Sequence, residues 1–221
     1  MSTQPVPPRH VPVVPVMRRP SPVDPLPGTW AVIGVGDHGA AVLAGLGRGG
    51  VPALGYDRRE PAPDVESAET VRWGHEVIAI DEIEDIEALA VTSRDVVTHE
   101  ITTEYFSGVA IGVGAYGDWP FIDPDLLNVV DGRPVLAHRM FTPRHPAVIV
   151  SGPDVAVGLE RQADVIAAYA ASLRTRPREA LSFHRRACAR LLPGYPRVRT
   201  DPVAGEDYDT VLDRDLETLH A

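Results

Sequence analysis

The sequence has only one cysteine, Cys188, among its 221 residues. A single thiol excludes a disulfide within the chain and a zinc site built from several cysteines. Arginines surround it on a predicted helix, and we interpret it as a packing residue. Histidine is better represented, with 8 residues, but no pair has the spacing of a helical metal site. The sequence therefore predicts no metal centre.

Positive charge and long apolar runs are also scarce. The chain has 21 Lys and Arg against 31 Asp and Glu, a net charge of −10. A broad nucleic-acid surface needs clustered positive charge, so a nucleic-acid partner is not expected. No apolar run approaches the roughly 20 residues of a membrane-spanning helix, and the proline-broken N-terminus does not resemble a signal peptide. We expect a cytoplasmic protein without a membrane partner.

Proline is concentrated in the first 28 residues. Proline fixes the φ angle and removes a backbone donor, so residues 1–28 are predicted to form a disordered or polyproline-II-like tail. Apolar residues make up 44% of the chain, which is enough for a buried core. We predict one folded domain at 29–192 and a C-terminal extension at 193–221.

A strand, a glycine-rich turn, a helix and a second strand follow the proline-rich segment. Thr29–Val35 is an apolar, β-branched run typical of a buried parallel strand. Ala40–Arg48 is rich in small residues and predicts a closely packed helix, which Gly49 and Gly50 end. Val51–Tyr56 predicts the second strand. This order is that of a βαβ unit.

The turn between the first strand and the helix carries Gly34-x-Gly36-x-x-Gly39, and Asp57 stands 21 residues after Gly36. Gly34 permits the tight turn, Gly36 lets the backbone approach a pyrophosphate, and Gly39 lets helix and strand pack together. The helix start offers N–H groups to phosphates, and Asp57 can accept hydrogen bonds from an adenosine ribose. The sequence therefore predicts a site for the ADP half of a dinucleotide.

The neighbouring residues leave the choice of dinucleotide open. Asp57 disfavours a 2′-phosphate by charge repulsion, whereas Arg58 and Arg59 favour one. Asp37 and His38 lie in the turn and are included among the candidate contacts; a solvent-facing histidine is the alternative at position 38. FAD satisfies the same pattern, so FAD and NAD(P) are both candidates.

The rest of the chain predicts an α/β, Rossmann-like three-layer domain with a small β-meander. Residues 60–75 are expected to form a loop, followed by a strand at 76–80 and an acidic turn at 81–87. Short strands are expected at 88–92, 96–103 and 106–113, and mostly loop at 120–146. A buried strand at 147–150 and helices at 157–173 and 177–192 complete the domain.

Four segments, in the same order along the chain, resemble flavin-containing monooxygenases and their Baeyer–Villiger relatives. Ala31–Glu60 is similar to the FAD-binding βαβ start of that family. Phe106–Asp125 resembles a later strand and loop, in which Gly112-Val113-Gly114 replaces the family's Ala-Thr-Gly. His145–Leu173 resembles the family's late strand and helix, and the C-terminal extension resembles its ending.

The resemblance implies a flavoprotein acting on a small-molecule substrate. In the family, NADPH reduces the flavin, and oxygen then forms a hydroperoxyflavin that oxygenates a nitrogen, sulfur or carbonyl substrate. The flavin, and not a set of acid and base residues, performs that chemistry, so no catalytic residue is assigned. The cofactor contacts implied by the resemblance are Gly34, Gly36, Gly39 and Asp57 at the ADP half, with Gly114, Gly152 and Asp154 added toward the flavin end.

The chain resembles the family's FAD domain without its NADPH domain, because we identify no second Gly-rich motif for NADPH. Two hypotheses follow. The first is an FAD-dependent oxidoreductase, for example in a specialised biosynthetic pathway. The second is a non-catalytic dinucleotide-binding or scaffold remnant that acts through a partner protein. Because the missing domain normally covers part of the flavin, a homo-oligomer or a partner subunit is expected to close the site.

Overall fold

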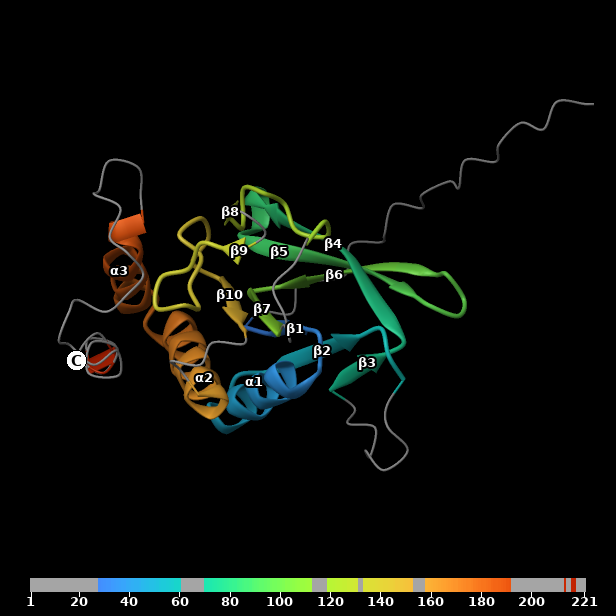
Figure 1. The fold of residues 1–221 in the computed structure, drawn as a ribbon, viewed down its shortest axis with the longest axis horizontal. Helices are drawn as coiled ribbons and strands as arrows, with labels where there is room; N and C mark the ends of the chain where they lie inside the picture. The colour runs from blue at the N-terminus through green and yellow to red at the C-terminus, as the bar shows by residue number, and fades with distance from the viewer. Residues whose placement is uncertain are drawn as a thin grey trace, which may run out of the picture.

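The computed structural model describes residues 28–60, 70–112, 119–130, 133–152 and 158–191, together with Asp213, Leu216 and Glu217. At its centre is a parallel sheet of five strands in the order β10-β7-β1-β2-β3 (Figure 1). β2 pairs with one edge of β1 and β7 with the other. The connections therefore change direction at β1. The strands are β1 (Trp30–Ile33), β2 (Ala53–Asp57), β3 (Val71–Trp73), β7 (Gly108–Gly112) and β10 (Val148–Ser151).

Both faces of this sheet are buried. Successive residues of a strand point to opposite faces. In β1, Trp30 and Val32 belong to one apolar cluster, whereas Ala31 and Ile33 belong to the other. All four side chains are buried, which explains why the strand is apolar throughout and does not alternate with polar residues.

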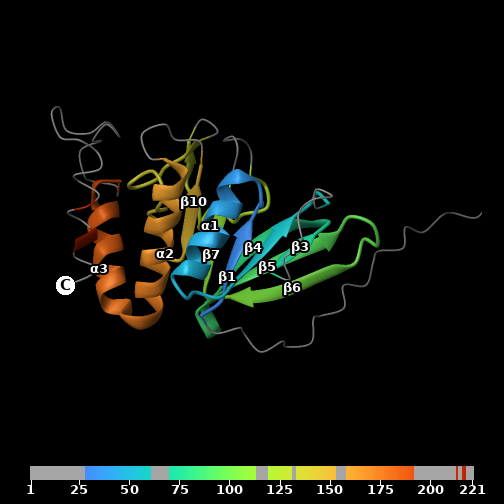
Figure 2. The ribbon, with the colours of Figure 1, turned by 90° about the horizontal axis from the view of Figure 1, so that it is seen from below.

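Helices cover one face of the sheet. α1 (Asp37–Arg48) and α2 (Leu159–Thr175) lie side by side on it, and α3 (Pro177–Cys188) packs outside α2 (Figures 1 and 2). Gly45 allows a close approach of the first two helices, because a Cβ there would lie 2.8 Å from the carbonyl oxygen of Ala163. The small residues of the predicted helix thus serve helix packing, as expected.

An antiparallel meander covers the other face, made of β4 (His75–Ile83), β5 (Ala88–Asp95) and β6 (Ile101–Phe106). Apolar side chains of all three strands join the second cluster beneath the sheet. Meander, sheet and helices form three layers, which confirms the predicted α/β, Rossmann-like fold. Short elements complete the chain: the 3-10 turns η1 (Glu84–Ile86) and η2 (Ala189–Leu191), and the ribbon of β8 (Val129–Val130) and β9 (Arg133–Pro134).

One strand was not predicted. Val71–Trp73 lies in a segment expected to be a loop, but it forms β3 and pairs in parallel with β2. Three residues are too few for any periodicity to show. The edge of β2 supplies the partner, so the tertiary structure decides this element.

One predicted strand is wrong in its first half. Val96–Thr98 was expected to be extended, yet it forms the turn between β5 and β6. Asp95 causes the turn, because its Oδ1 accepts the backbone N–H groups of Val97 and Thr98, each at 2.8 Å. An aspartate side chain that bonds nearby backbone in this way outweighs the strand preference of β-branched residues.

The terminal segments fall largely outside the described residues. Of the predicted tail at 1–28, the structure describes only Gly28. Of the extension at 193–221 it describes three residues, all helical, and Leu216 joins the core on the helical side of the sheet. Within the described part of the chain, no helix combines the length and the apolar character needed to cross a membrane.

Candidate functional site

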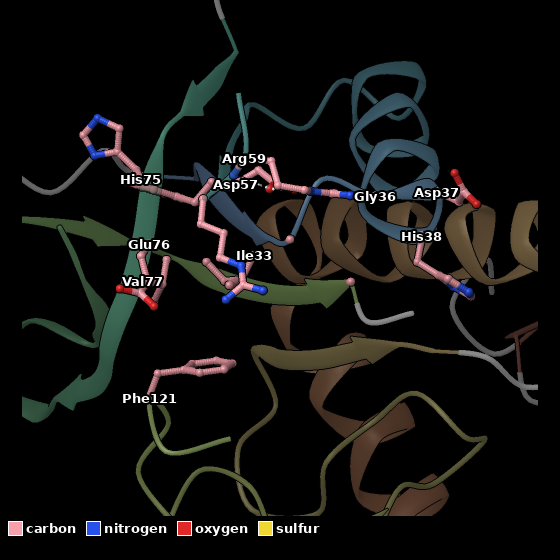
Figure 3. A pocket seen from close by; sticks show the side chains of 14 residues that line it. Ile33, Gly36, Asp37, His38, Asp57, Arg59, His75, Glu76, Val77 and Phe121 are labelled. Atoms are coloured by element: carbon pink, nitrogen blue, oxygen red, sulfur yellow. Dashed lines mark hydrogen bonds and ion pairs between the residues drawn. The ribbon is translucent and has the colours of Figure 1, made fainter. Parts of the chain in front are cut away.

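A cavity of about 630 Å³ opens at the carboxyl ends of β1 and β2, beside the start of α1. In open parallel sheets, ligands bind at this edge, where the connections change direction. Figure 3 shows the start of α1 on one side of the cavity and β4 on the other. The lining residues are Ile33, Gly34, Gly36, Asp37, His38, Tyr56, Asp57, Arg58, Arg59, His75, Glu76, Val77, Gly112 and Phe121.

Three glycines hold the strand-to-helix turn together by direct backbone contact. Gly34 has a φ of +82°, a conformation that side chains rarely adopt. A Cβ on Gly39 would lie 1.9 Å from the carbonyl oxygen of Gly34. A Cβ on Gly112 would lie 2.6 Å from the backbone nitrogen of Gly39. β1, β7 and the first turn of α1 therefore meet at a distance that only glycine permits.

Gly36 differs from these three because it lines the cavity, where a Cβ would meet only the end of a flexible side chain. The nearest atom to a Cβ placed there would be Arg59 Nη2, at 3.4 Å. Its φ of −78° is open to any residue, so the backbone does not require glycine at this position. Gly36 is also the N-cap of α1, and it makes no side-chain cap hydrogen bond. The first-turn N–H groups of α1 thus lie beside the cavity, and no side chain at position 36 separates them from it.

Asp57 ends β2 and is held by four hydrogen bonds. Its Oδ2 accepts the N–H of Val35 and Nη2 of Arg59, each at 2.8 Å. Its Oδ1 accepts the backbone N–H and Nε of Arg59, each at 2.9 Å. Burial opposes the charged form of Asp57, but the hydrogen bonds and charge of Arg59 outweigh it, so the pKa of Asp57 lies below its ordinary value.

Asp57→Asn is expected to lower the free energy of unfolding by about 2 kcal/mol at neutral pH, the size of lost hydrogen bonds to a charged group. Because the pKa of Asp57 is lower in the folded state, its carboxylate stabilises the fold above the unfolded-state pKa. That contribution is lost as pH falls through the folded-state pKa. Urea unfolding should therefore show the difference from wild type shrinking below about pH 4.

The control for this experiment is Asp37→Asn, because Asp37 is exposed at the same cavity. It removes an equal charge without touching a buried carboxylate. A stability difference for Asp57→Asn that stays constant from neutral to acidic pH would contradict the assigned ionisation.

Tyr56 lines the cavity and is almost fully buried. Its hydroxyl donates to Oε2 of Glu104 at 2.6 Å, and Arg72 Nη2 donates to Oε1 of the same carboxylate at 2.6 Å. This network joins β2, β3 and β6. Burial, and then Glu104, raise the pKa of the Tyr56 phenol, so it is held as a donor and is no candidate base.

A chain of hydrogen bonds, buried except at His38, links the start of α1 to the end of β10. The amide of Gln162 accepts the N–H of Gly152 through Oε1 at 3.2 Å and donates to its carbonyl oxygen through Nε2 at 3.1 Å. Ser151 Oγ donates to the same Oε1 at 3.0 Å. The Ser151 hydroxyl has only one hydrogen, so it can only accept from His38 Nδ1, which lies 3.2 Å away. Nδ1 of His38 therefore carries the proton.

The structure brings most of the predicted site residues together. Gly34, Gly36, Asp37, His38, Asp57 and Arg58 line the cavity, and Gly39 packs directly behind it. Gly152 is buried at the end of β10 and does not line the cavity; it joins the site through Gln162, Ser151 and His38. Gly114 and Asp154 lie outside the described residues.

Gly112 was missed, although a signal for it exists in the sequence. Gly112 is the last residue of β7, and with Gly114 and Gly117 it has the spacing G-x-G-x-x-G. Gly112 contacts the first glycine turn directly. It therefore belongs to the same site, and this spacing does not by itself mark a second one for NADPH.

The remaining missed residues had no local signal. Gln162 and Ser151 matter through partners distant in sequence, and His75, Glu76 and Val77 reach the cavity because the meander folds back over β2. Cys188, interpreted as a packing residue, is indeed buried in the core, and burial raises the pKa of its thiol to about 12. Among the described residues, no group of three potential metal ligands gathers.

The sheet is parallel and its connections reverse at β1, a bare glycine turn begins α1, and a buried acid ends β2; these features define a Rossmann-like fold. The structure is similar to that of S-allyl-L-cysteine S-oxygenase from Allium sativum, with a TM-score of 0.59 and 11% sequence identity. The alignment covers 86% of this chain and 88% of that one. The predicted resemblance to monooxygenases is thus confirmed at the level of the fold.

Other solved structures align over a smaller part. A cadaverine monooxygenase from Erwinia amylovora, solved with FAD, has a TM-score of 0.34 and 13% identity over 41% of this chain and 36% of that chain. Ornithine hydroxylase from Pseudomonas aeruginosa has a TM-score of 0.35 and 13% identity over 42% of this chain and 40% of that chain. No protein-family model matches the sequence, and no curated protein sequence matches it.

Proposed function

We propose that the cavity binds the ADP half of FAD and that the protein is an FAD-dependent oxidoreductase resembling flavin-containing monooxygenases. The observation that carries the proposal is the bare backbone at Gly36, which faces a cavity at the N-terminus of α1. A helix start with uncapped N–H groups suits a pyrophosphate, and the cavity volume is in the range of small-molecule sites.

Each part of the site has a role in this proposal. Gly36 and the first turn of α1 would hold the pyrophosphate, Asp57 would contact the adenosine ribose, and residues of β4 that line the cavity would border the adenine. Asp37 adds a negative charge near the phosphates, and the cations of Arg58 and Arg59 at the cavity offset it. A bound flavin supplies the redox chemistry, while these residues bind and orient it.

The variant Gly36→Val tests directly whether FAD binds in this cavity. The substitution adds bulk to the cavity and meets only the end of the flexible Arg59 side chain. We expect the purified wild type to show a flavin absorption spectrum or to bind added FAD. Gly36→Val should lose FAD affinity by about a hundredfold or more, because the backbone can no longer approach the phosphates.

The thermal unfolding midpoint of Gly36→Val should stay close to that of wild type, which separates a blocked site from a misfolded one. If neither FAD nor NAD(P) binds the wild type with saturation, or if Gly36→Val binds FAD as well as the wild type, the proposal is wrong.

A non-catalytic role is the second candidate, and the resemblance to an FAD domain without an NADPH domain favours it. FAD binding is common to both candidates, so turnover has to distinguish them. Two results support the enzyme. One is oxidation of NADPH by the protein, and the other is reaction of a substrate when the chemically reduced flavin is oxidised by oxygen. A homo-oligomer or partner subunit that covers the flavin, a small-molecule substrate and a cytoplasmic location remain predictions.

A further inference from the structure

The carboxylate of Asp57 has no acceptor position left for a ligand. An ionised carboxylate offers about four lone-pair positions, two on each oxygen. Each oxygen of Asp57 already accepts two N–H groups, from Val35 and Arg59 on Oδ2 and twice from Arg59 on Oδ1. An adenosine ribose therefore finds Asp57 occupied.

The occupying groups are of two kinds. The N–H groups of Val35 and Arg59 belong to the backbone and are fixed by the fold. The other two donors are Nε and Nη2 of the Arg59 guanidinium, and they take one position on each oxygen. The 2′,3′-diol of a ribose also brings two neighbouring donors to a carboxylate. The guanidinium fork thus fills the positions that a ribose diol needs.

Arg59 also lies in the place where the ribose has to sit. Its Nη2 approaches Asp57 on one side and the Cβ position of Gly36 on the other, at 2.8 and 3.4 Å. Figure 3 shows the side chain reaching from the end of β2 toward Gly36. The guanidinium therefore bridges the ribose end and the phosphate end of the proposed site.

In the ion pair of Asp57 and Arg59, only the arginine side chain has room to move. The Asp57 side chain is 4% exposed, whereas the Arg59 side chain is 64% exposed. An ion pair with so exposed a partner is weak and has little packing to hold it. A ligand can displace the guanidinium without disturbing the buried carboxylate.

We propose that Arg59 competes with the adenosine ribose for Asp57, so that a nucleotide with a free 2′,3′-diol binds by displacing the guanidinium. The inference rests on the proposed function, since it takes the cavity to hold an adenine nucleotide. It makes Arg59 a specificity-determining residue: in the wild type, a ribose diol gains little from Asp57, because each bond it makes replaces one from Arg59.

The test compares ADP with 2′-deoxy-ADP by isothermal titration calorimetry. In the wild type, loss of the 2′-hydroxyl should weaken binding by only about twofold, because Arg59 retakes the released position. In Arg59→Met, Asp57 is available to the diol, and the same loss should weaken binding by about tenfold, the size of one hydrogen bond to a charged group.

Two further variants make the result specific. Arg58→Met removes the same charge from the neighbouring residue of the cavity, but it removes no hydrogen bond to Asp57. It should therefore keep the wild-type ratio of the affinities for ADP and 2′-deoxy-ADP. Arg59→Lys keeps the charge but lacks the two-donor fork, and should behave like Arg59→Met. Arg58→Met is expected to keep the wild-type unfolding midpoint. The Arg59 variants lose hydrogen bonds and charge that stabilise the buried Asp57 carboxylate, so they should unfold at a lower temperature, and binding is measured below that midpoint.

Several outcomes overturn the inference. Equal ratios in wild type and Arg59→Met would show that Arg59 does not compete for Asp57. Tighter binding of adenosine 2′,5′-bisphosphate than of ADP in the wild type, lost in Arg59→Met but kept in Arg58→Met, would make Arg59 a 2′-phosphate contact. Either of these two outcomes would contradict the inference but not the proposed nucleotide site. If neither ADP nor FAD binds, both the proposed function and this inference are wrong.

Discussion

Gly39→Ala is expected to cost at least about 4 kcal/mol of unfolding free energy, a large part of the 5–15 kcal/mol typical of a domain. The added Cβ would lie 1.9 Å from the carbonyl oxygen of Gly34 and 2.9 Å from its carbonyl carbon. These atoms belong to the backbone of the turn, so no flexible side chain can give way. Either α1 moves away from β1 or the turn deforms, and both disturb the core beneath.

Gly47→Ala is the matched control, because Gly47 lies in the same helix and a Cβ there would meet nothing within 4 Å. That substitution should stabilise the protein by up to about 1 kcal/mol, through the better helix propensity of alanine. Urea or thermal unfolding of the two variants measures the contrast. Wild-type stability of Gly39→Ala would show that β1 and α1 do not pack as described.

Gln162→Leu is expected to lower the free energy of unfolding by about 3 kcal/mol, because it leaves buried polar groups without partners. Gln162 is 1% exposed and its amide serves Ser151 Oγ and both backbone groups of Gly152. Leucine is close to glutamine in size, so lost packing contributes little. The unsatisfied N–H and carbonyl of Gly152 account for most of the effect.

Ser151→Ala provides the comparison, since it removes one hydroxyl but keeps the bonds between Gln162 and Gly152. Its cost should be about 1 kcal/mol. Chemical denaturation of both variants gives the two values. Equal effects of the two substitutions would mean that the contacts with Gly152 contribute nothing, contrary to this assignment.

These two predictions concern the parts of the molecule that hold the proposed site in shape. Gly39 fixes the distance between β1 and α1, and Gln162 fixes the end of β10 relative to α2. His38, between them, bonds to Ser151. The cavity is therefore bordered by segments whose positions depend on close backbone packing and on one buried amide.

The βαβ unit and its glycine turn were predictable because their determinants are local. The apolar run at Trp30–Ile33 and the spacing of Gly34, Gly36 and Gly39 each specify their structure with few distant partners. The three-layer fold could also be predicted, since a strand apolar throughout requires cover on both faces. Small residues in α1 indicated its close packing.

Other features depended on partners far away in the chain and gave no local signal. β3 exists because β2 offers an edge, and the link from His38 to Ser151 joins residues separated by 113 positions. A strand preference at Val96–Thr98 lost to the side chain of Asp95. Periodicity measures only the average burial of a segment, so single hydrogen bonds of this kind escape it.

The sequence by itself predicted the candidate site, through the glycine spacing of the strand-to-helix turn and an acid at the end of the second strand. The tertiary structure alone decided the state of that acid. Asp57 is buried, and its acceptor positions are filled by Arg59, two residues away, and by the N–H of Val35. Side-chain direction and burial arise only when β2 packs into the sheet. They explain why the carboxylate of Asp57, predicted as a ribose contact, is already bound by the Arg59 side chain.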